Sequence, residues 1–283
     1  MRLSADRAAV TFTAALAVFL ACASGPSTAG PSPSNAQSQS SAGSQSDQEV
    51  EIGQEVYNEL KGKGEIVATS PLYAQLEPIA ARITQAAQPM YNHPFKFYLV
   101  HQTQPNAFST PGGNVYVADS LLYFVKNTEE LAGTLCHEVS HTIHHDTMEL
   151  EEKRQRLAAR EVGAGILIGP TPARVAALAI VGKLNSLGYS REAESRADVT
   201  GSDICAGAGY NPWGLVWLFT DFENANIGEA PELLSDHPSD ERRVQTLKAH
   251  FKQHPETFAK YDPNPGSSTP MHVPAQMAET FVQ

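Results

Sequence analysis

Cysteine is scarce in this chain. The 283 residues include three cysteines, Cys22, Cys136 and Cys205. Three cysteines cannot build the disulfide framework of a small secreted domain, and their wide spacing does not match a zinc knuckle. A hydrophobic core must therefore stabilise the fold, and a hydrophobic content of 41% is enough for one substantial core.

Basic residues are also few. The 20 lysines and arginines are outnumbered by 31 aspartates and glutamates, which gives a net charge of −11, and no basic run occurs. A nucleic-acid-binding surface needs clustered positive charge. We therefore expect no nucleic acid among the partners of this protein.

The sequence lacks a hydrophobic run long enough to cross a membrane. Its longest run, from Ala8 to Ala21, follows Arg2 and Arg7 and is soon replaced by polar sequence, which is typical of a signal peptide over residues 1–22. The four residues that end at Cys22 resemble a bacterial lipobox, so we favour lipidation of this cysteine. The small residues on either side of Cys22 leave cleavage by signal peptidase I as the alternative.

Residues 23–46 are almost entirely Ser, Gln, Gly, Pro and Ala, a composition that predicts a disordered tether. A tether after a lipidated cysteine indicates a protein anchored on the periplasmic side of a bacterial envelope, most simply to the outer membrane. A soluble periplasmic or secreted protein is the alternative. Folded sequence is expected over residues 47–254, and the Pro- and Ser-rich residues 255–283 should form a flexible tail.

Glu129 to Asp146 is the stretch that carries chemistry. It contains His137, Glu138 and His141 in the order H-E-x-x-H. Four residues make slightly more than one helical turn, so both imidazoles project from one face and can bind a zinc ion. Glu138 can then reach a water on the metal as a base. Two ordinary surface histidines are the alternative for so short a pattern.

The surroundings favour a helix that carries this motif. Asn127 and Glu130 have the spacing of an N-cap and its N3 partner. Apolar residues then recur at three- and four-residue intervals and place the motif on a half-buried helix. The longer zincin pattern is excluded because His144 and Thr147 stand where it needs Gly and His. The third ligand must come from elsewhere in the chain.

Three short strands are expected before this helix, at Phe95–His101, Asn106–Ser109 and Asn114–Ala118, with a tight turn at Thr110–Gly113. A sheet beside a metal helix could pair its edge with an extended substrate. The predicted substrate edge consists of Asn106, Asn114, Val115, Tyr116 and Val117. An ordinary sheet edge is the alternative.

A second acidic helix over Tyr189–Ala206 offers the missing carboxylate. Ser190 is placed to cap it, and Glu194 and Asp198 lie one turn apart. A solvated acidic face paired with Arg191 and Arg196 is the alternative. The remaining predicted helices are Gln48–Leu60, one from Pro71 that should kink or restart at Pro78, Pro172–Leu184, Trp213–Phe222 and Asp240–Phe251. Glu149–Glu161 should be a solvated helix or a mobile flap.

Four blocks together resemble the M48 zinc metallopeptidases, in particular their periplasmic or lipoprotein members. They are Asn106-Ala107-Phe108 with Pro111-Gly112-Gly113, then His137-Glu138-Val139-Ser140-His141, then Glu194 with Ala197-Asp198, and finally His237-Pro238-Ser239 with Glu241-Arg242. The resemblance covers about Asp47 to His250. It implies an α+β fold that is mostly helical and zincin-like, with a small three-stranded sheet beside the active-site helix.

The resemblance also implies roles for single residues. Glu194 would be the third zinc ligand, Asp198 would support the site through a ligating imidazole, and Glu138 would be the general base. His237 matches a histidine assigned either to transition-state stabilisation or to inhibitory ligation, and His237 or Arg242 would stabilise the oxyanion. Asp146 departs from the family, because relatives often carry a basic residue or His there. The chain also ends soon after the His237 block, so we expect it to lack the C-terminal helical repeats of longer relatives.

These expectations describe an endopeptidase with one Zn²⁺ per chain that hydrolyses unfolded or misassembled envelope proteins. The alternative is an envelope chaperone or assembly factor that binds unfolded clients and has a latent or structural zinc site. Cys205 lies about 16 Å beyond Glu194 along its helix. We therefore expect Cys136 and Cys205 to be two buried thiols and not a disulfide.

Overall fold

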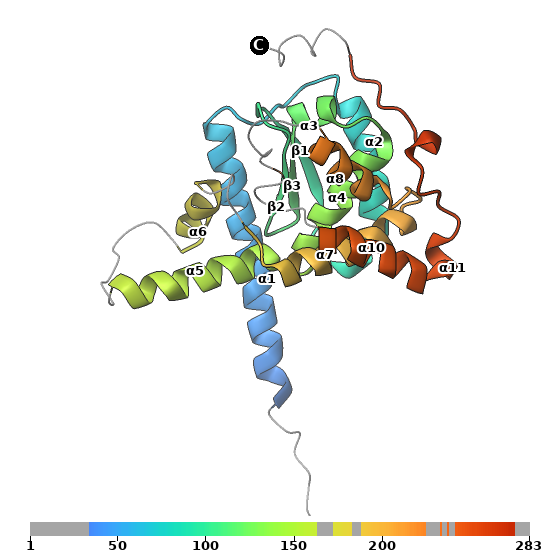
Figure 1. Cartoon of the computed structure of the whole chain (residues 1–283). Coiled ribbons are helices and arrows are strands. Elements are labelled where there is room, and N and C mark those ends of the chain that lie inside the picture. The colour runs from blue at the N-terminus through green and yellow to red at the C-terminus, as the bar shows by residue number, and fades with distance from the viewer. Residues whose placement is uncertain are drawn as a thin grey trace, which may run out of the picture.

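A three-stranded sheet packs beside the helix that carries the two histidines (Figure 1). The computed structural model describes residues 34–162, 172–182, 188–224, 233, 237 and 241–274. The predicted signal peptide and Cys22 lie outside these residues. The fold class is confirmed as α+β, mostly helical, with one small sheet.

The sheet contains β1 (Lys96–Val100), β2 (Ala107–Thr110) and β3 (Asn114–Ala118), in the order β1-β3-β2. β1 runs parallel to β3, and β2 runs antiparallel to it. The predicted turn between β2 and β3 needs its two glycines, because Gly112 and Gly113 have φ angles of 81° and 89°. All three strands lie within one residue or two of the predicted positions.

The predicted substrate edge is wrong, because β3 is the central strand. Residues Asn114 to Val117 pair with β1 on one side and with β2 on the other. Their backbone groups therefore already form hydrogen bonds within the sheet and cannot bind a substrate strand. The Asn114 side chain donates to the carbonyl oxygen of Gly53 at 3.0 Å. The carbonyl of Asn106 accepts from the Ala118 backbone at 2.9 Å. The edge strand on this side of the sheet is β2.

The histidine helix is α4 (Thr128–Ile143), and it begins as predicted. The Asn127 side chain accepts from the backbone N–H of Glu130 at 2.9 Å, and the Glu130 carboxylate accepts from the backbone N–H of Lys126 at 2.8 Å. The helix is more buried than a single apolar stripe predicts, because β2, α2 (Tyr73–Ala87), α7 (Arg191–Gly207) and α8 (Gly214–Asn224) all pack against it. It is therefore the central element of the fold.

The other helices surround α4 and the sheet. Figure 1 shows α7 and α10 together below α4 and α8, with α5 extending away from them. No helix in the described ranges has both the length and the apolar character needed to span a membrane. The bounds not yet given are α1 Ser34–Gly62, η1 Gln88–Met90, α3 Asp119–Phe124, α5 Asp146–Val162, α6 Pro172–Val181, α10 Glu241–Gln253, α11 Pro255–Phe258 and η3 Pro265–Ser267.

Two N-terminal expectations differ from the structure. Helix α1 begins at Ser34, inside the segment predicted as a tether. Ser, Gln and Ala, which dominate this segment, are compatible with a helix once it continues into Gln48–Leu60. Helix α2 continues through Pro78 without a break. Pro78 removes a single backbone donor near the start of the helix, while Leu76 and Ile79 on either side of it are buried in the core.

The described part of the C-terminal tail is structured, which contradicts the predicted flexible tail. Phe258 is buried, and the Trp217 indole N–H donates to the carbonyl of Pro263 at 2.8 Å. Thr128, the first residue of α4, donates its backbone N–H to the carbonyl of Thr269 at 2.8 Å. These single long-range hydrogen bonds leave no periodic pattern in the sequence, so composition alone could not reveal them.

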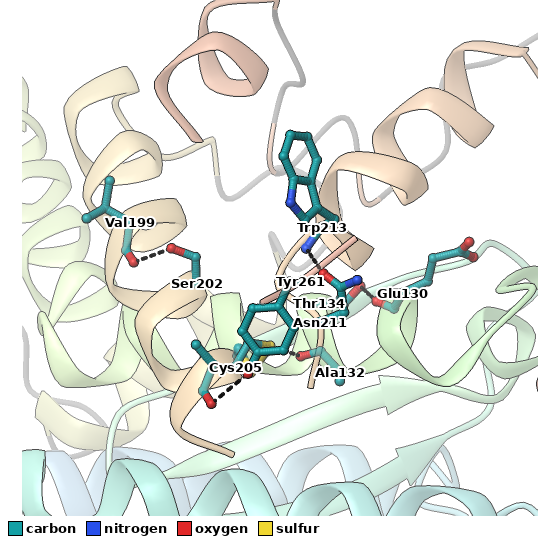
Figure 2. Close-up of a disulfide and its surroundings, with 11 residues drawn as sticks. Glu130, Ala132, Thr134, Val199, Ser202, Cys205, Asn211, Trp213 and Tyr261 are labelled. Atoms are coloured by element: carbon teal, nitrogen blue, oxygen red, sulfur yellow. Dashed lines mark hydrogen bonds between the residues drawn. A yellow bond between two sulfur atoms is a disulfide. The ribbon is translucent and has the colours of Figure 1, made fainter. Parts of the chain in front are cut away.

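Cys136 and Cys205 form a disulfide, so the expectation of two thiols is wrong. Their Cα atoms are 5.8 Å apart, and both side chains are buried. Figure 2 shows Cys205 next to Ala132 of α4, with its sulfur 3.3 Å from the Ala132 carbonyl oxygen. The distance of about 16 Å from Glu194 to Cys205 runs along α7 and does not give the distance between Cys205 and Cys136 on the neighbouring helix. Because α4 and α7 run antiparallel, residues late in α7 lie opposite residues early in α4.

Candidate metal centre

Four buried side chains converge where α4 and α7 meet the chain just before α10. They are His137 and His141 of α4, Glu194 of α7, and His237, and one ligand atom of each lies within 4.8 Å of the others. The two histidine Nε2 atoms are 3.0 Å apart. Glu194 oxygens lie 3.4 Å from Nε2 of His137 and 3.6 Å from Nε2 of His141. The structure thus brings together the three predicted ligands and His237.

A carboxylate stands behind each histidine of α4. Asp198 Oδ1 lies 3.1 Å from Nδ1 of His137, and Asp146 Oδ2 lies 2.8 Å from Nδ1 of His141. A carboxylate favours a proton on the nitrogen that faces it, so each Nε2 presents a lone pair to the centre of the group. Asp198 has the predicted place. The role of Asp146 was not predicted.

This donor set fits a metal cation. Two Nε2 lone pairs that face each other at 3.0 Å, beside a carboxylate, repel one another unless a proton or a cation lies between them. Two imidazoles and a glutamate are the protein ligands of many catalytic zinc sites. The buried group of histidines and glutamate is therefore a candidate metal centre.

The pKa values of the two histidines show how strongly the group attracts positive charge. Burial opposes protonation of His137, but the carboxylates of Asp198 and Glu194 outweigh it and raise its pKa to about 9. Burial and repulsion from His137 lower the pKa of His141 to about 3. One positive charge is thus favoured in the pair and a second is not, as expected of two ligands that share one cation.

Glu138 lies beside the four converging residues and is fully buried. Its Oε1 atom is 3.3 Å from Nε2 of His237. Burial raises the pKa of Glu138, and the nearby His237 and His137 offset part of that rise. A carboxyl group with a raised pKa can take and return a proton near neutral pH. Its position and environment are those of a general base.

His237 is within reach of the ligands as well as of Glu138. Its Nδ1 atom lies 3.2 Å from Nε2 of His137 and 2.9 Å from Oε1 of Glu194. Its neighbours Pro238 and Ser239, which belong to the predicted block, lie outside the described residues. Tyr189 stacks on the His141 ring with 4.1 Å between centroids and closes another side of the site.

The arginine that contacts this site is Arg243, which sequence reasoning missed. Its guanidinium donates to both oxygens of Asp198 at 2.6 and 2.7 Å and to the carbonyl of His237 at 3.0 Å, and it forms an ion pair with Glu194 at 2.8 Å. The predicted Arg242 is exposed on α10 and lines an adjacent groove. Arg243 shares a helical stripe with the buried Leu247, and this spacing could have identified it as the inward-facing arginine.

Comparison with known proteins agrees with this geometry. Peptidase family M48 matches residues 71–250 of the chain. The beta-barrel assembly-enhancing protease of Escherichia coli K12 is 25% identical over 216 residues, which cover 73% of this chain and 44% of that protein. The mitochondrial metalloendopeptidase OMA1 of Schizosaccharomyces pombe is 25% identical over 216 residues, which cover 71% of this chain and 60% of that protein.

A third relative, a protease HtpX homolog of Aquifex aeolicus, is 28% identical over 203 residues, which cover 54% of this chain and 64% of that protein. The chain spans less than half the length of the bacterial assembly-enhancing proteases that it matches. The matched family region includes α4, α7 and His237, and thus every residue of the candidate metal centre. The chain belongs to peptidase family M48.

Proposed function

We propose that this protein is a zinc-dependent endopeptidase that hydrolyses unfolded or misassembled proteins of the bacterial cell envelope. The observation that carries the proposal is the convergence of His137, His141 and Glu194, with Glu138 buried beside them. A purely structural metal site has no need of a base at that place.

His137, His141 and Glu194 would hold one Zn²⁺ per chain. When bound, zinc would supply Lewis acidity to the scissile carbonyl and to the attacking water. Glu138 takes the proton of that water during attack and returns it to the leaving amine. Asp198 and Asp146 keep the two imidazoles oriented, and Arg243 keeps Asp198 and Glu194 charged and in place.

His237 has two possible roles in this mechanism. Its Nδ1 atom is close to His137 and Glu194, which supports a fourth ligand that keeps the site latent. Its Nε2 atom faces Glu138, which supports a contact to the reacting atoms once substrate is bound. Replacement of His237 with Ala separates the roles: cleavage rises if His237 inhibits and falls if it stabilises the transition state.

An extended, unfolded chain is the proposed substrate. β2 is an edge strand beside α4, and a peptide that paired with it would bring a carbonyl to the site. This strand replaces β3 of the sequence prediction. The name of the assembly-enhancing relatives supports an envelope location. Anchoring through a lipidated Cys22 would keep the enzyme at a membrane. Equal cleavage rates for folded and unfolded forms of one protein would contradict the preference for unfolded chains.

Cleavage of casein by the zinc-loaded wild type and by a Glu138→Gln variant tests the proposal. We expect cleavage by the wild type, and loss of cleavage in the variant with its zinc content unchanged. Glu256→Gln, an exposed change on α11 outside the site, is the matched control and should cleave like the wild type. Activity retained by Glu138→Gln would contradict the role of the base. Zinc binding without cleavage by the wild type, even after His237→Ala, would favour a client-binding assembly factor.

A further inference from the structure

A large groove leads away from the metal centre between α7 and α10. Its volume is about 1120 Å³, and its lining includes Tyr189, Glu194 and Arg243 from the site itself. A cavity beside His141 is far smaller and holds about 10 Å³. The groove therefore has room for a polypeptide segment next to the site.

Exposed arginines line the outer wall of this groove. Arg191, Arg196 and Arg242 line it with exposed side chains, whereas Glu192 is the exposed carboxylate in its lining. Arg196 also contacts Asp146 and lies 3.8 Å from Glu149. Arg191 and Arg242 stand on different helices, one on each side of the groove. Arg191 and Arg242 therefore place exposed positive charge on both sides of the groove, in a chain whose net charge is −11.

We infer that this groove selects substrate segments rich in aspartate and glutamate next to the cleaved bond. The inference rests on the proposed peptidase function, because it assigns the groove to the polypeptide that reaches Glu194. Arginine presents a planar fork of donors that matches a carboxylate, so two arginines across a groove can hold acidic side chains of one extended segment. The remainder of the protein, being acidic, repels such a segment, so attraction must come from the groove.

The expected preference is moderate and depends on salt. Exposed ion pairs are weak, so two arginines should favour an acidic peptide by a factor on the order of 5 to 10 over a neutral one. The interaction is between solvent-exposed charges and is therefore screened as ionic strength rises. Added salt should reduce the preference without changing the affinity for the neutral peptide.

Binding to the zinc-loaded full chain with Glu138→Gln tests the inference without any cleavage. The probes are two fluorescein-labelled peptides of equal length, one with Asp and Glu and one with Asn and Gln at the same positions, measured by fluorescence anisotropy. Arg191→Glu/Arg242→Glu reverses the charge of these two positions in the groove. Lys248→Glu/Lys252→Glu changes the net charge equally on the exposed side of α10, outside the groove lining. Arg191→Gln/Arg242→Gln is the milder variant if the first one unfolds.

We expect tighter binding of the acidic peptide, loss of that preference in the groove variants, and its retention in the lysine variant. Equal binding of the two peptides would overturn the inference. A preference for the acidic peptide that persists in the groove variants would also overturn the inference. So would an equal loss of that preference in the lysine variant. Cleavage of the same peptides by the wild type is a separate readout. If the wild type binds the acidic peptide preferentially but cleaves neither peptide, the proposed peptidase function is refuted and the proposed selectivity of the groove is not.

Discussion

At the scale of single residues, Asp198 and Asp146 stand behind the Nδ1 atoms of His137 and His141 at 3.1 and 2.8 Å. Burial opposes ionisation of Asp146, but His141 and Arg196 outweigh it and lower its pKa. The aspartate is therefore charged and holds the His141 ring with Nε2 toward the other ligands. Such supporting carboxylates fix the tautomer and orientation of a ligating imidazole and raise its basicity.

Asp146→Asn should weaken zinc binding by roughly 10- to 100-fold, because the amide no longer favours the Nδ1–H form of His141. Competition with a chromophoric zinc chelator measures this affinity. Glu149→Gln, a neighbouring exposed carboxylate, is the control and should leave it unchanged. An Asp146→Asn protein with the affinity of the wild type would refute the orienting role.

Arg243 is a second residue whose role is local. It is buried against two carboxylates, so Arg243→Leu leaves Asp198 and Glu194 without their counterion. We expect the free energy of unfolding to fall by about 3–5 kcal/mol in urea titrations of the metal-free protein. The adjacent, exposed Arg242→Leu should change it by less than about 0.5 kcal/mol. Similar effects of the two substitutions would contradict the structural distinction between them.

The residues of the site differ in how far the sequence reveals them. His137, His141 and Glu138 follow from helical spacing, and Glu194 and Asp198 follow from the spacing on α7 together with the family resemblance. Asp146 is five residues after His141, a spacing that does not bring side chains together on a helix. It reaches His141 because α4 ends at Ile143 and His145 adopts a φ of 57°. A chain reversal of this kind produces no periodic pattern in the sequence, so the contact between Asp146 and His141 could not be predicted.

At the scale of elements, α4 and α7 are one antiparallel pair that carries the three candidate metal ligands His137, His141 and Glu194. Gly201 allows close contact, since a Cβ atom there would lie 3.1 Å from the backbone of Cys136 and His137. The capping residues Asn127 and Ser190 predicted where both helices begin, and the structure confirms both N-caps. Hydrophobic periodicity supported α4. The periodicity of hydrophobic residues does not show which helices pack together or in which direction. The disulfide was not predicted for that reason.

The disulfide should contribute substantially to the stability of this helix pair. It joins residues 69 positions apart, and closing a loop of that size in the unfolded chain corresponds to about 4 kcal/mol. Cys136→Ala/Cys205→Ala should lower the free energy of unfolding in urea by roughly that amount. A reductant should destabilise the wild type to a similar degree and leave the double variant unaffected. Titration of two additional free thiols in the unreduced wild type would contradict the disulfide.

At the scale of the whole molecule, the fold class and the three strands follow from the sequence, whereas the arrangement does not. Alternation identifies β1, and the two glycines predict the β2–β3 hairpin. The spacing of hydrophobic residues does not show that β1 pairs with β3. This pairing makes β3 the central strand and places β2 at an edge. The tail across the start of α4 is held by individual long-range hydrogen bonds, as at Thr269. Composition therefore predicted flexibility where the structure has order.

The most direct test of the account is the zinc content of the purified protein, measured by inductively coupled plasma mass spectrometry after equilibration with zinc and removal of excess metal. We predict one zinc ion per chain in the wild type. Glu194→Ala should hold markedly less, and Glu192→Ala, two residues away and exposed, should match the wild type. A wild type without zinc, or a Glu194→Ala protein that retains a full equivalent, would contradict the metal centre assigned to α4 and α7.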